Sequence, residues 1–148
     1  MQKKINIQNK KARFEYEILD KFVAGIQLTG TEIKSIRLSQ ARITESFCEF
    51  NDRGELFIVN MYIQEYMFGH HFNHKPKSER RLLLNKRELR SLKKDVEAKG
   101  NTIVPLKLFI NDRGFAKLEI ALAKGKQTHD KRNVIKDRDN KRDLARIK

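Results

Sequence analysis

Apolar and polar residues alternate over much of residues 14–123, which is the period of a half-buried β-strand. FEYEIL places Phe14, Tyr16 and Ile18 on one face, and FVAGIQL follows after a break at Asp20-Lys21. Further runs with strand character are ITESFCEF, ELFIVNMYI, RRLLL, TIVPLKLFI and FAKLEIALA. The pattern predicts a mostly β protein.

Turn signals separate these runs. NDRG occurs at 51–54 and again at 111–114, each time between two strand-like runs. A short Asn/Asp loop that ends in Gly predicts a hairpin, because Gly readily adopts positive φ. The flanking runs share little else, so we interpret the repeat as two plain turns. Pro105 predicts that its strand is an edge strand or carries a bulge.

Two segments have helical character. TGTEIKSIRLSQ opens with Thr29 and has Glu32 three residues later, and Asn85 precedes Glu88 in the same way. Both pairs fit a capping box at the start of a helix. Antiparallel strands in so short a chain favour a small closed barrel with helices at its ends. We therefore expect an OB-like antiparallel β-barrel with two or three α-helices and a disordered basic C-terminal tail.

The net charge of +14 is concentrated at the two ends of the chain. Residues 1–13 hold five basic and no acidic side chains, and residues 124–148 hold ten basic and four acidic ones. Charge segregated in this way favours a polyanionic partner over a role in solubility alone. We expect a basic N-terminal extension (1–13), a nucleic-acid-binding barrel (14–123) and a basic C-terminal tail (124–148).

The sequence contains no feature of secretion or membrane insertion. Cys48 is the single cysteine, and no apolar run follows the basic N-terminus or approaches the length of a membrane span. A cytoplasmic protein is expected.

Catalysis finds little support in the sequence. His70, His71 and His74 lie close together, but no cysteine or carboxylate stands at ligand spacing, so exposed or phosphate-facing histidines are favoured over a metal site. Neither a Gly-rich phosphate cradle nor a nucleophile motif is present. We expect no enzyme activity, no metal and no cofactor.

The segment HKPKSERRLLLNKREL has the composition of a nucleic-acid-binding surface. Phe72 and Tyr66 lie shortly before it and would either stack on bases or pack in the core. A solvated loop remains an alternative interpretation. The basic residues of this segment are Lys75, Lys77, Arg80, Arg81, Lys86 and Arg87.

Several motifs together resemble one family. NKKARFEYEI, LTGTEIKSIR, RRLLLNKREL and LEIALAKGKQTHDKR are similar in order and spacing to the small protein B (SmpB) family, from about Asn9 to the C-terminus. The resemblance implies an OB-like barrel that binds the tRNA-like domain of transfer-messenger RNA (tmRNA). It further implies delivery of this RNA, charged with alanine, to stalled bacterial ribosomes in trans-translation. Elongation factor Tu and alanyl-tRNA synthetase would be indirect partners, and the protein would act as a monomer.

The resemblance also implies roles for particular residues. Glu32, Leu83 and Asn85 match positions that contact the RNA in the family, although each also has a structural interpretation as a cap or a core residue. Tyr16 matches a family position, whereas Phe14 replaces a common His. Gly125 matches the signature at which the family's tail begins.

The tail is expected to contact the ribosome. The family implies a segment that is unstructured in solution and becomes helical in the empty mRNA channel of the small subunit. The helix-spaced pair Asp137–Lys141 fits such a latent helix, since each such pair contributes about 0.2–0.5 kcal/mol. Asn140 stands where many members carry Trp. The expected decoding-centre residues are Asp130, Lys131, Arg132, Lys136, Arg138 and Asn140.

Two other functions remain open on the sequence. One is a general RNA-binding or ribosome-associated OB protein without a dedicated RNA. The other, less favoured, is a metal-dependent RNA enzyme that uses the histidines.

Overall fold

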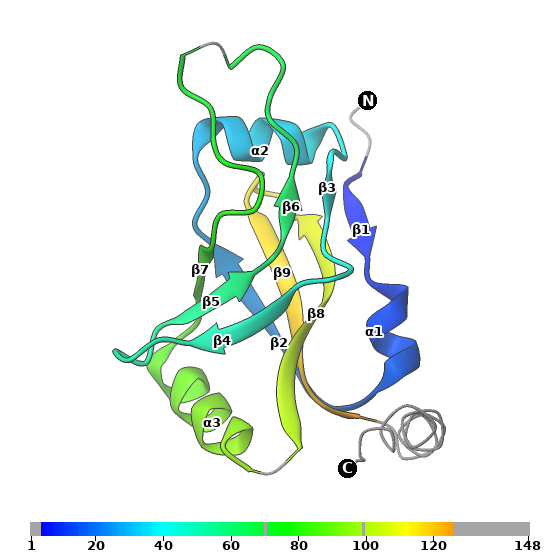
Figure 1. The fold of residues 1–148 in the computed structure, drawn as a ribbon, viewed down its shortest axis with the longest axis vertical. Helices are drawn as coiled ribbons and strands as arrows, with labels where there is room; N and C mark the ends of the chain where they lie inside the picture. Colours follow the sequence, from blue (N-terminus) through cyan, green and yellow to red (C-terminus); the bar gives the residue numbers. More distant parts are fainter. Residues whose placement is uncertain (1–3, 70, 99, 126–148) are drawn as a thin grey trace, which may run out of the picture.

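The computed structural model describes residues 4–69, 71–98 and 100–125 (Figure 1). These residues form a mostly β structure with three helices, α1 (Lys10–Glu15), α2 (Gly30–Arg37) and α3 (Lys86–Val96). The strands are β1 (Asn6–Gln8), β2 (Tyr16–Ile26), β3 (Ala41–Arg42), β4 (Phe47–Phe50), β5 (Leu56–Val59), β6 (Tyr62–Ile63), β7 (Arg80–Leu83), β8 (Asn101–Ile110) and β9 (Ala116–Gly125).

Six of the strands form a closed ring in which every pairing is antiparallel. The order is β8–β4–β5–β7–β2–β9, and β9 pairs back with β8. β1 adds to β8, while β3 and β6 form a separate two-stranded sheet. The expected mostly β architecture with helices is confirmed.

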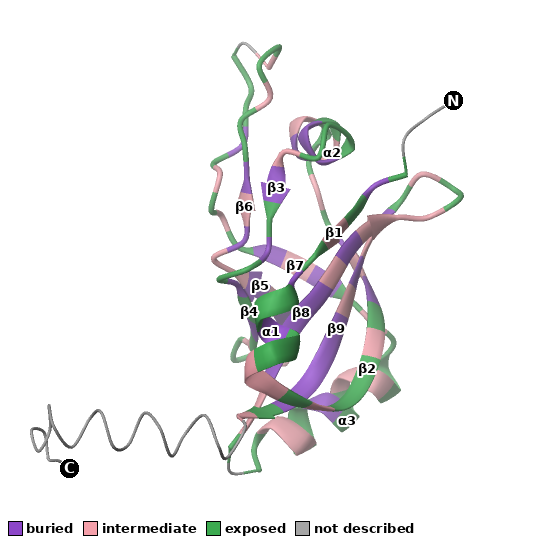
Figure 2. Cartoon of the chain, turned by 90° about the vertical axis from the view of Figure 1, so that its right-hand side faces the viewer, coloured by how far each residue is buried: buried purple, intermediate pink, exposed green. Residues whose placement is uncertain are grey.

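The inward-facing residues of the ring form one apolar core. Ile58, Leu82 and Leu118 are almost fully inaccessible to solvent and alternate with more exposed neighbours along their strands. Buried and exposed positions follow one another along the strands of the ring (Figure 2). α2 and α3 lie at opposite ends of the ring (Figure 1). Leu92 of α3 joins this core, so the helix closes its end of the ring.

Both NDRG segments form the hairpin turns expected from the sequence. They connect β4 with β5 and β8 with β9, and Gly54 and Gly114 have φ values of 79° and 87°. A side chain is disfavoured at such φ, which is why each turn ends in Gly. The register of β8 shifts between Pro105 and Lys107, so the bulge interpretation of Pro105 is confirmed.

The start of the barrel differs from the expectation. Phe14 and Glu15 were expected in a strand but belong to α1, and Asn9 caps this helix by accepting a hydrogen bond from the N–H of Ala12 at 3.1 Å. β2 then runs without a break through Asp20-Lys21 and accommodates the irregularity as a bulge at Leu19. Phe14 therefore lies on an exposed helix face, not on a strand with Tyr16.

The run ELFIVNMYI is two strands rather than one. Asn60 has φ of 67°, a left-handed conformation that Asn tolerates better than most residues. The chain bends there, so β5 stays in the ring while β6 leaves it to pair with β3. This bend carries the following residues, 64–79, away from the ring as a long connection to β7.

The residues expected as an N-terminal extension are partly packed on the ring. β1 pairs with β8, and Ile5 and Asn9 are buried. Asn9 Nδ2 also donates to the Pro105 carbonyl at 2.9 Å.

At the C-terminal end of the chain, residues 126–148 of the expected tail lie outside the described residues. No helix in the described ranges is long and apolar enough to cross a membrane.

Candidate nucleic-acid interface

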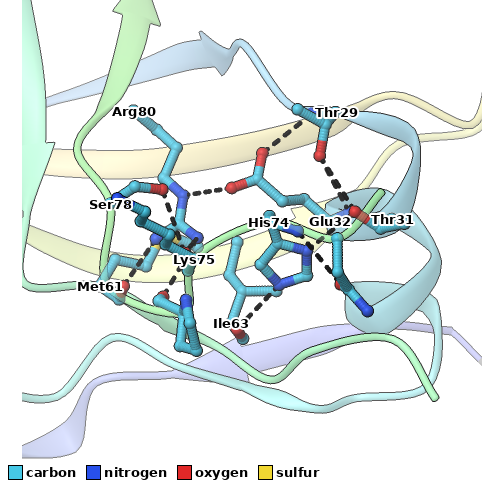
Figure 3. A network of polar contacts seen from close by, with 11 residues as sticks. Thr29, Thr31, Glu32, Met61, Ile63, His74, Lys75, Ser78 and Arg80 are labelled. Atoms are coloured by element: carbon cyan, nitrogen blue, oxygen red, sulfur yellow. Dashed lines mark hydrogen bonds and ion pairs between the residues drawn. The ribbon is translucent and has the colours of Figure 1, made fainter. Parts of the chain in front are cut away.

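Glu32 combines two roles at the first turn of α2. Its Oε1 accepts a hydrogen bond from the N–H of Thr29 at 2.9 Å, and its own N–H donates to Thr29 Oγ1. This is the expected capping box. The second carboxylate oxygen, Oε2, accepts a hydrogen bond from Arg80 Nε at 2.6 Å (Figure 3). Glu32 is only 3% exposed, so both of its oxygens are used inside the protein.

Arg80 joins three segments through one guanidinium group. Nη1 donates to the carbonyl of Met61 at 2.7 Å, and Nη2 donates to the carbonyls of Lys75 and Pro76 at 3.2 and 3.1 Å. With the bond to Glu32, these contacts tie α2 to the residues after β5 and to the chain that leads into β7 (Figure 3). The guanidinium therefore orders the backbone that carries Lys75.

The expectation that Arg80 is one of several exposed loop cations was wrong. Arg80 begins β7, where alternate side chains point to opposite faces of the sheet. Arg80 and Leu82 point inward and are 3% and 1% exposed, whereas Arg81 and Leu83 point outward. A composition-based interpretation of RRLLL does not distinguish the two arginines, because strand register decides which one is buried.

An open groove lies beside the Glu32–Arg80 pair. Arg81 lines it and forms an ion pair with Glu55 at 3.3 Å, with both side chains partly exposed. Lys75 also lines the groove, and Lys77 is exposed on the same connection. Further lining residues include Gln27, Leu28, Thr29, Phe57, Ser78 and Glu79. The groove is thus lined by cations, carboxylates and polar groups, and the buried Glu32–Arg80 pair is part of its lining.

Leu83 and Asn85 continue this surface along β7. Leu83 is 44% exposed and lies opposite Gly25 of β2, so the expectation of a core residue was wrong. Asn85 caps α3: its side chain accepts from the N–H of Glu88 at 2.8 Å, and Glu88 returns a bond to the N–H of Asn85. Among the described residues the Nδ2 group of Asn85 has no hydrogen-bond acceptor, so the cap leaves its two N–H donors for a ligand.

Tyr16 and Gly125 lie at a different part of the molecule. They are register partners at the ends of β2 and β9, and Tyr16 packs against a small apolar cluster that includes Ala12. The structure therefore brings together the start of the barrel and the start of the tail. Six expected tail residues lie outside the described residues: Asp130, Lys131, Arg132, Lys136, Arg138 and Asn140.

The histidines do not form a metal site in the described part of the chain. His74 is buried, and its Nε2 lies 2.9 Å from the carbonyl of Ile63, which can only accept, so Nε2 carries the proton. Nδ1 then accepts from the hydroxyl of Thr31 at 2.9 Å. His74 was expected to be exposed or to face phosphate and is instead structural. Within residues 4–69, 71–98 and 100–125, no three His, Cys, Asp or Glu side chains gather as metal ligands.

Three exposed apolar side chains at the tip of residues 64–79 were only partly anticipated. Phe72 was a candidate for base stacking, but Met67 and Phe68 were not singled out. Their signal in the sequence is an apolar pair next to Gly69 in a segment without strand or helix periodicity. Apolar residues in a loop either anchor the loop to the core or form an exposed contact surface, and only their burial in the structure distinguishes the two.

Comparison with known proteins identifies relatives over the whole chain. The family model described as SmpB protein matches residues 6–148. The SsrA-binding protein of Flavobacterium psychrophilum is 68% identical over 148 residues, which is 100% of this chain and 98% of the relative. The SsrA-binding protein of Bacteroides thetaiotaomicron is 51% identical over 99% of this chain and 97% of the relative.

A solved structure is also similar. It is described as "tmRNA-SmpB: a journey to the center of the bacterial ribosome" and superposes with a TM-score of 0.69 at 48% sequence identity. The match covers 83% of this chain and 85% of that chain.

Proposed function

Because the chain belongs to the SmpB protein family, we propose that it binds tmRNA and acts with it in trans-translation on the ribosome. Two findings support this function: relatives named SsrA-binding proteins match over nearly their whole length, and the description of a similar solved structure names tmRNA-SmpB and the bacterial ribosome. The family membership is the observation that carries the proposal. The protein would act by binding, without a catalytic step of its own.

We further propose that the outer face of β7 and its two flanks bind the tRNA-like domain of tmRNA. Arg81 and Leu83 point outward from this strand, with Lys75 before it and the free amide donors of Asn85 after it. Cations would contact phosphates, and the amide would donate to base edges or 2′-hydroxyls of unpaired nucleotides. In this arrangement Glu32 is a positioning residue that acts through Arg80.

The finer architecture belongs to the same proposal. We interpret the closed ring as an OB-like barrel, a fold that commonly presents one outer face to oligonucleotides.

The segment beyond Gly125 would leave the barrel beside Tyr16 and occupy the empty mRNA channel of the small subunit. Delivery of alanine-charged tmRNA would involve elongation factor Tu and alanyl-tRNA synthetase indirectly. We propose a monomer that works in the cytoplasm.

Competition binding tests the function directly. Purified full-length protein is bound to labelled tmRNA at moderate salt and challenged with unlabelled tmRNA or with bulk tRNA. A dedicated partner predicts that unlabelled tmRNA competes at far lower concentration than bulk tRNA. Equal competition would instead support a general RNA-binding protein and would contradict the proposal.

A further inference from the structure

The connection between β6 and β7, residues 64–79, projects beyond the ring next to α2 (Figures 1 and 2). Its tip exposes three large apolar side chains: Met67 is 72% exposed, Phe68 63% and Phe72 88%. Three large apolar side chains exposed within six residues of one connection are typical of an interaction site, because their exposure to water is unfavourable. The chemistry around the tip indicates which kind of partner it fits.

The tip is held in shape by its own polar contacts. The side chain of Asn73 accepts a hydrogen bond from the N–H of Tyr66 at 3.1 Å and donates to the carbonyl of Tyr66 at 2.8 Å. Asn73 thereby joins the two arms of the tip across seven residues. A Cβ at Gly69 would lie 2.6 Å from Asn73 Nδ2, so a side chain at this position would displace the Asn73 amide.

The foot of the connection is anchored to the body. His74 is buried between Thr31 of α2 and the Ile63 carbonyl of β6, and Arg80 holds the carbonyls of Lys75 and Pro76. The exposed rings are therefore presented on a supported frame. A supported ring loses less conformational entropy on binding than a ring on an unsupported segment.

Aromatic rings and cations are interleaved on this surface. Lys34 Nζ lies 5.6 Å from the centroid of the Tyr66 ring, and the rings of Tyr66 and Phe68 make an edge-to-face contact with 5.6 Å between centroids. Phe72 makes no ring contact with another described residue, so both of its faces remain available.

Unpaired ammonium groups lie on α2 next to the connection and at the foot of the connection. Lys34, Lys75 and Lys77 lie on or beside the connection, and none of them forms an ion pair with a described residue. On the connection itself the charges of Lys75 and Lys77 are matched in number by Glu65 and Glu79, so the one excess positive charge of this surface comes from Lys34 of α2. Aromatic rings beside unpaired ammonium groups fit single-stranded nucleic acid, where bases stack on the rings and phosphates contact the cations.

We propose that the tip of residues 64–79 is a base-stacking platform, on which Phe72 stacks on an unpaired base of the RNA held by the β7 surface. This proposal rests on the proposed function and names a second contact of the same RNA. Lys75 belongs to both the connection and the groove, so one RNA molecule can follow the surface from β7 to the tip. Phe68 and Met67 then line the apolar side of the platform.

A tryptophan reporter tests the stacking. The chain contains no Trp, so Phe72→Trp introduces a single fluorophore that retains a stacking ring. Phe115→Trp is the matched control, since Phe115 is likewise exposed, at 63% against 88% for Phe72, but lies after the β8–β9 turn. Stacking predicts that tmRNA strongly quenches the fluorophore introduced at position 72 and has little effect on the one introduced at position 115. Equal signals at both positions would overturn the platform.

Affinity measurements on full-length variants complete the test. Phe72→Ala should weaken tmRNA binding by about 5- to 150-fold, and Phe72→Leu should weaken it almost as much because leucine has no π-face. Phe72→Trp should bind like the wild type. The slope of log K against log salt should stay unchanged in Phe72→Ala, since no cation is removed.

The outcomes separate this proposal from the proposed function. Wild-type affinity of Phe72→Ala, or of Phe72→Leu, overturns stacking even when the wild type prefers tmRNA. A wild type without preference for tmRNA overturns the proposed function, and the Phe72 variants are then measured on the RNA that does bind. Equal melting temperatures confirm that a loss of binding is not a loss of folding.

Discussion

The carboxylate of Glu32 and the guanidinium of Arg80 form a buried ion pair with 2.6 Å between Oε2 and Nε, and each side chain is almost completely inaccessible to solvent. The two residues are 48 positions apart and come from α2 and β7. The pair connects the capped start of α2 to the backbone that carries Lys75. Glu32, which was expected from the sequence to contact RNA, thus has its acceptors occupied inside the protein.

Glu32→Ala is expected to destabilise the protein strongly. It leaves the buried Arg80 without its carboxylate and removes half of a capping box, and breaking a buried pair in this way costs about 3–5 kcal/mol. The measurement is the free energy of unfolding by urea. The expected loss therefore exceeds the cost of about 0.5–2 kcal/mol for removing a helix cap alone.

Glu55→Ala is the matched control for Glu32→Ala. Glu55 also pairs with an arginine, Arg81, but both side chains are partly exposed. Exposed pairs contribute only about 0.2–1 kcal/mol, so this variant should melt close to the wild type. Similar losses of stability in the two variants would contradict the special role of the buried pair.

Lys75→Ala combined with Lys77→Ala should reduce the salt dependence of tmRNA binding. Each ammonium that contacts a phosphate contributes about 0.7–0.9 to the slope of log K against log salt. Arg80 is not expected to contribute, because its guanidinium is buried. A slope equal to that of the wild type would mean that this part of residues 64–79 faces away from the RNA.

Asn85→Asp separates the two roles of Asn85. Aspartate is as good a helix cap as asparagine, so stability should be preserved, but it lacks the two amide N–H donors and adds a negative charge. We expect weaker tmRNA binding at an unchanged melting temperature. Asn85→Ala should lose RNA affinity and in addition about 0.5–2 kcal/mol of stability. Wild-type affinity of Asn85→Asp would remove this residue from the interface.

Leu83→Ala should weaken RNA binding without unfolding the protein. Leu83 is 44% exposed on the outer face of β7, and substitutions at such positions usually change stability by less than about 0.5 kcal/mol. Leu82→Ala is the inward-facing control: it should cost about 2–5 kcal/mol because Leu82 is buried in the core. If Leu83→Ala binds tmRNA like the wild type, the outer face of β7 is not the contact surface.

Deletion of residues 130–148 should separate RNA binding from function on the ribosome. The proposed RNA surface lies within the barrel, so specific tmRNA binding should persist in a gel-shift assay. Tagging of stalled nascent chains should be lost, because no segment then occupies the empty mRNA channel. The triple substitution Asp130→Ala, Lys131→Ala and Arg132→Ala should reproduce much of this loss. Tagging by the truncated protein would contradict a channel-sensing tail.

Local structure was determined largely by the sequence itself. The pairs Thr29–Glu32 and Asn85–Glu88 predicted two capping boxes, and both are formed, because a cap involves only four consecutive residues. The two NDRG turns depend on local φ preferences in the same way. The sequence also predicted the family, because the motifs of the family are short segments that occur in a fixed order along the chain.

Tertiary structure alone decided which side chains are accessible. Arg80 and Arg81 are adjacent and chemically identical, yet strand register buries one and exposes the other. His74 became a structural residue because α2 and β6 meet around it, and Phe72 remained on the surface because its connection projects beyond the ring. Burial depends on partners distant in sequence, such as Glu32 for Arg80, and a local pattern contains no information about them.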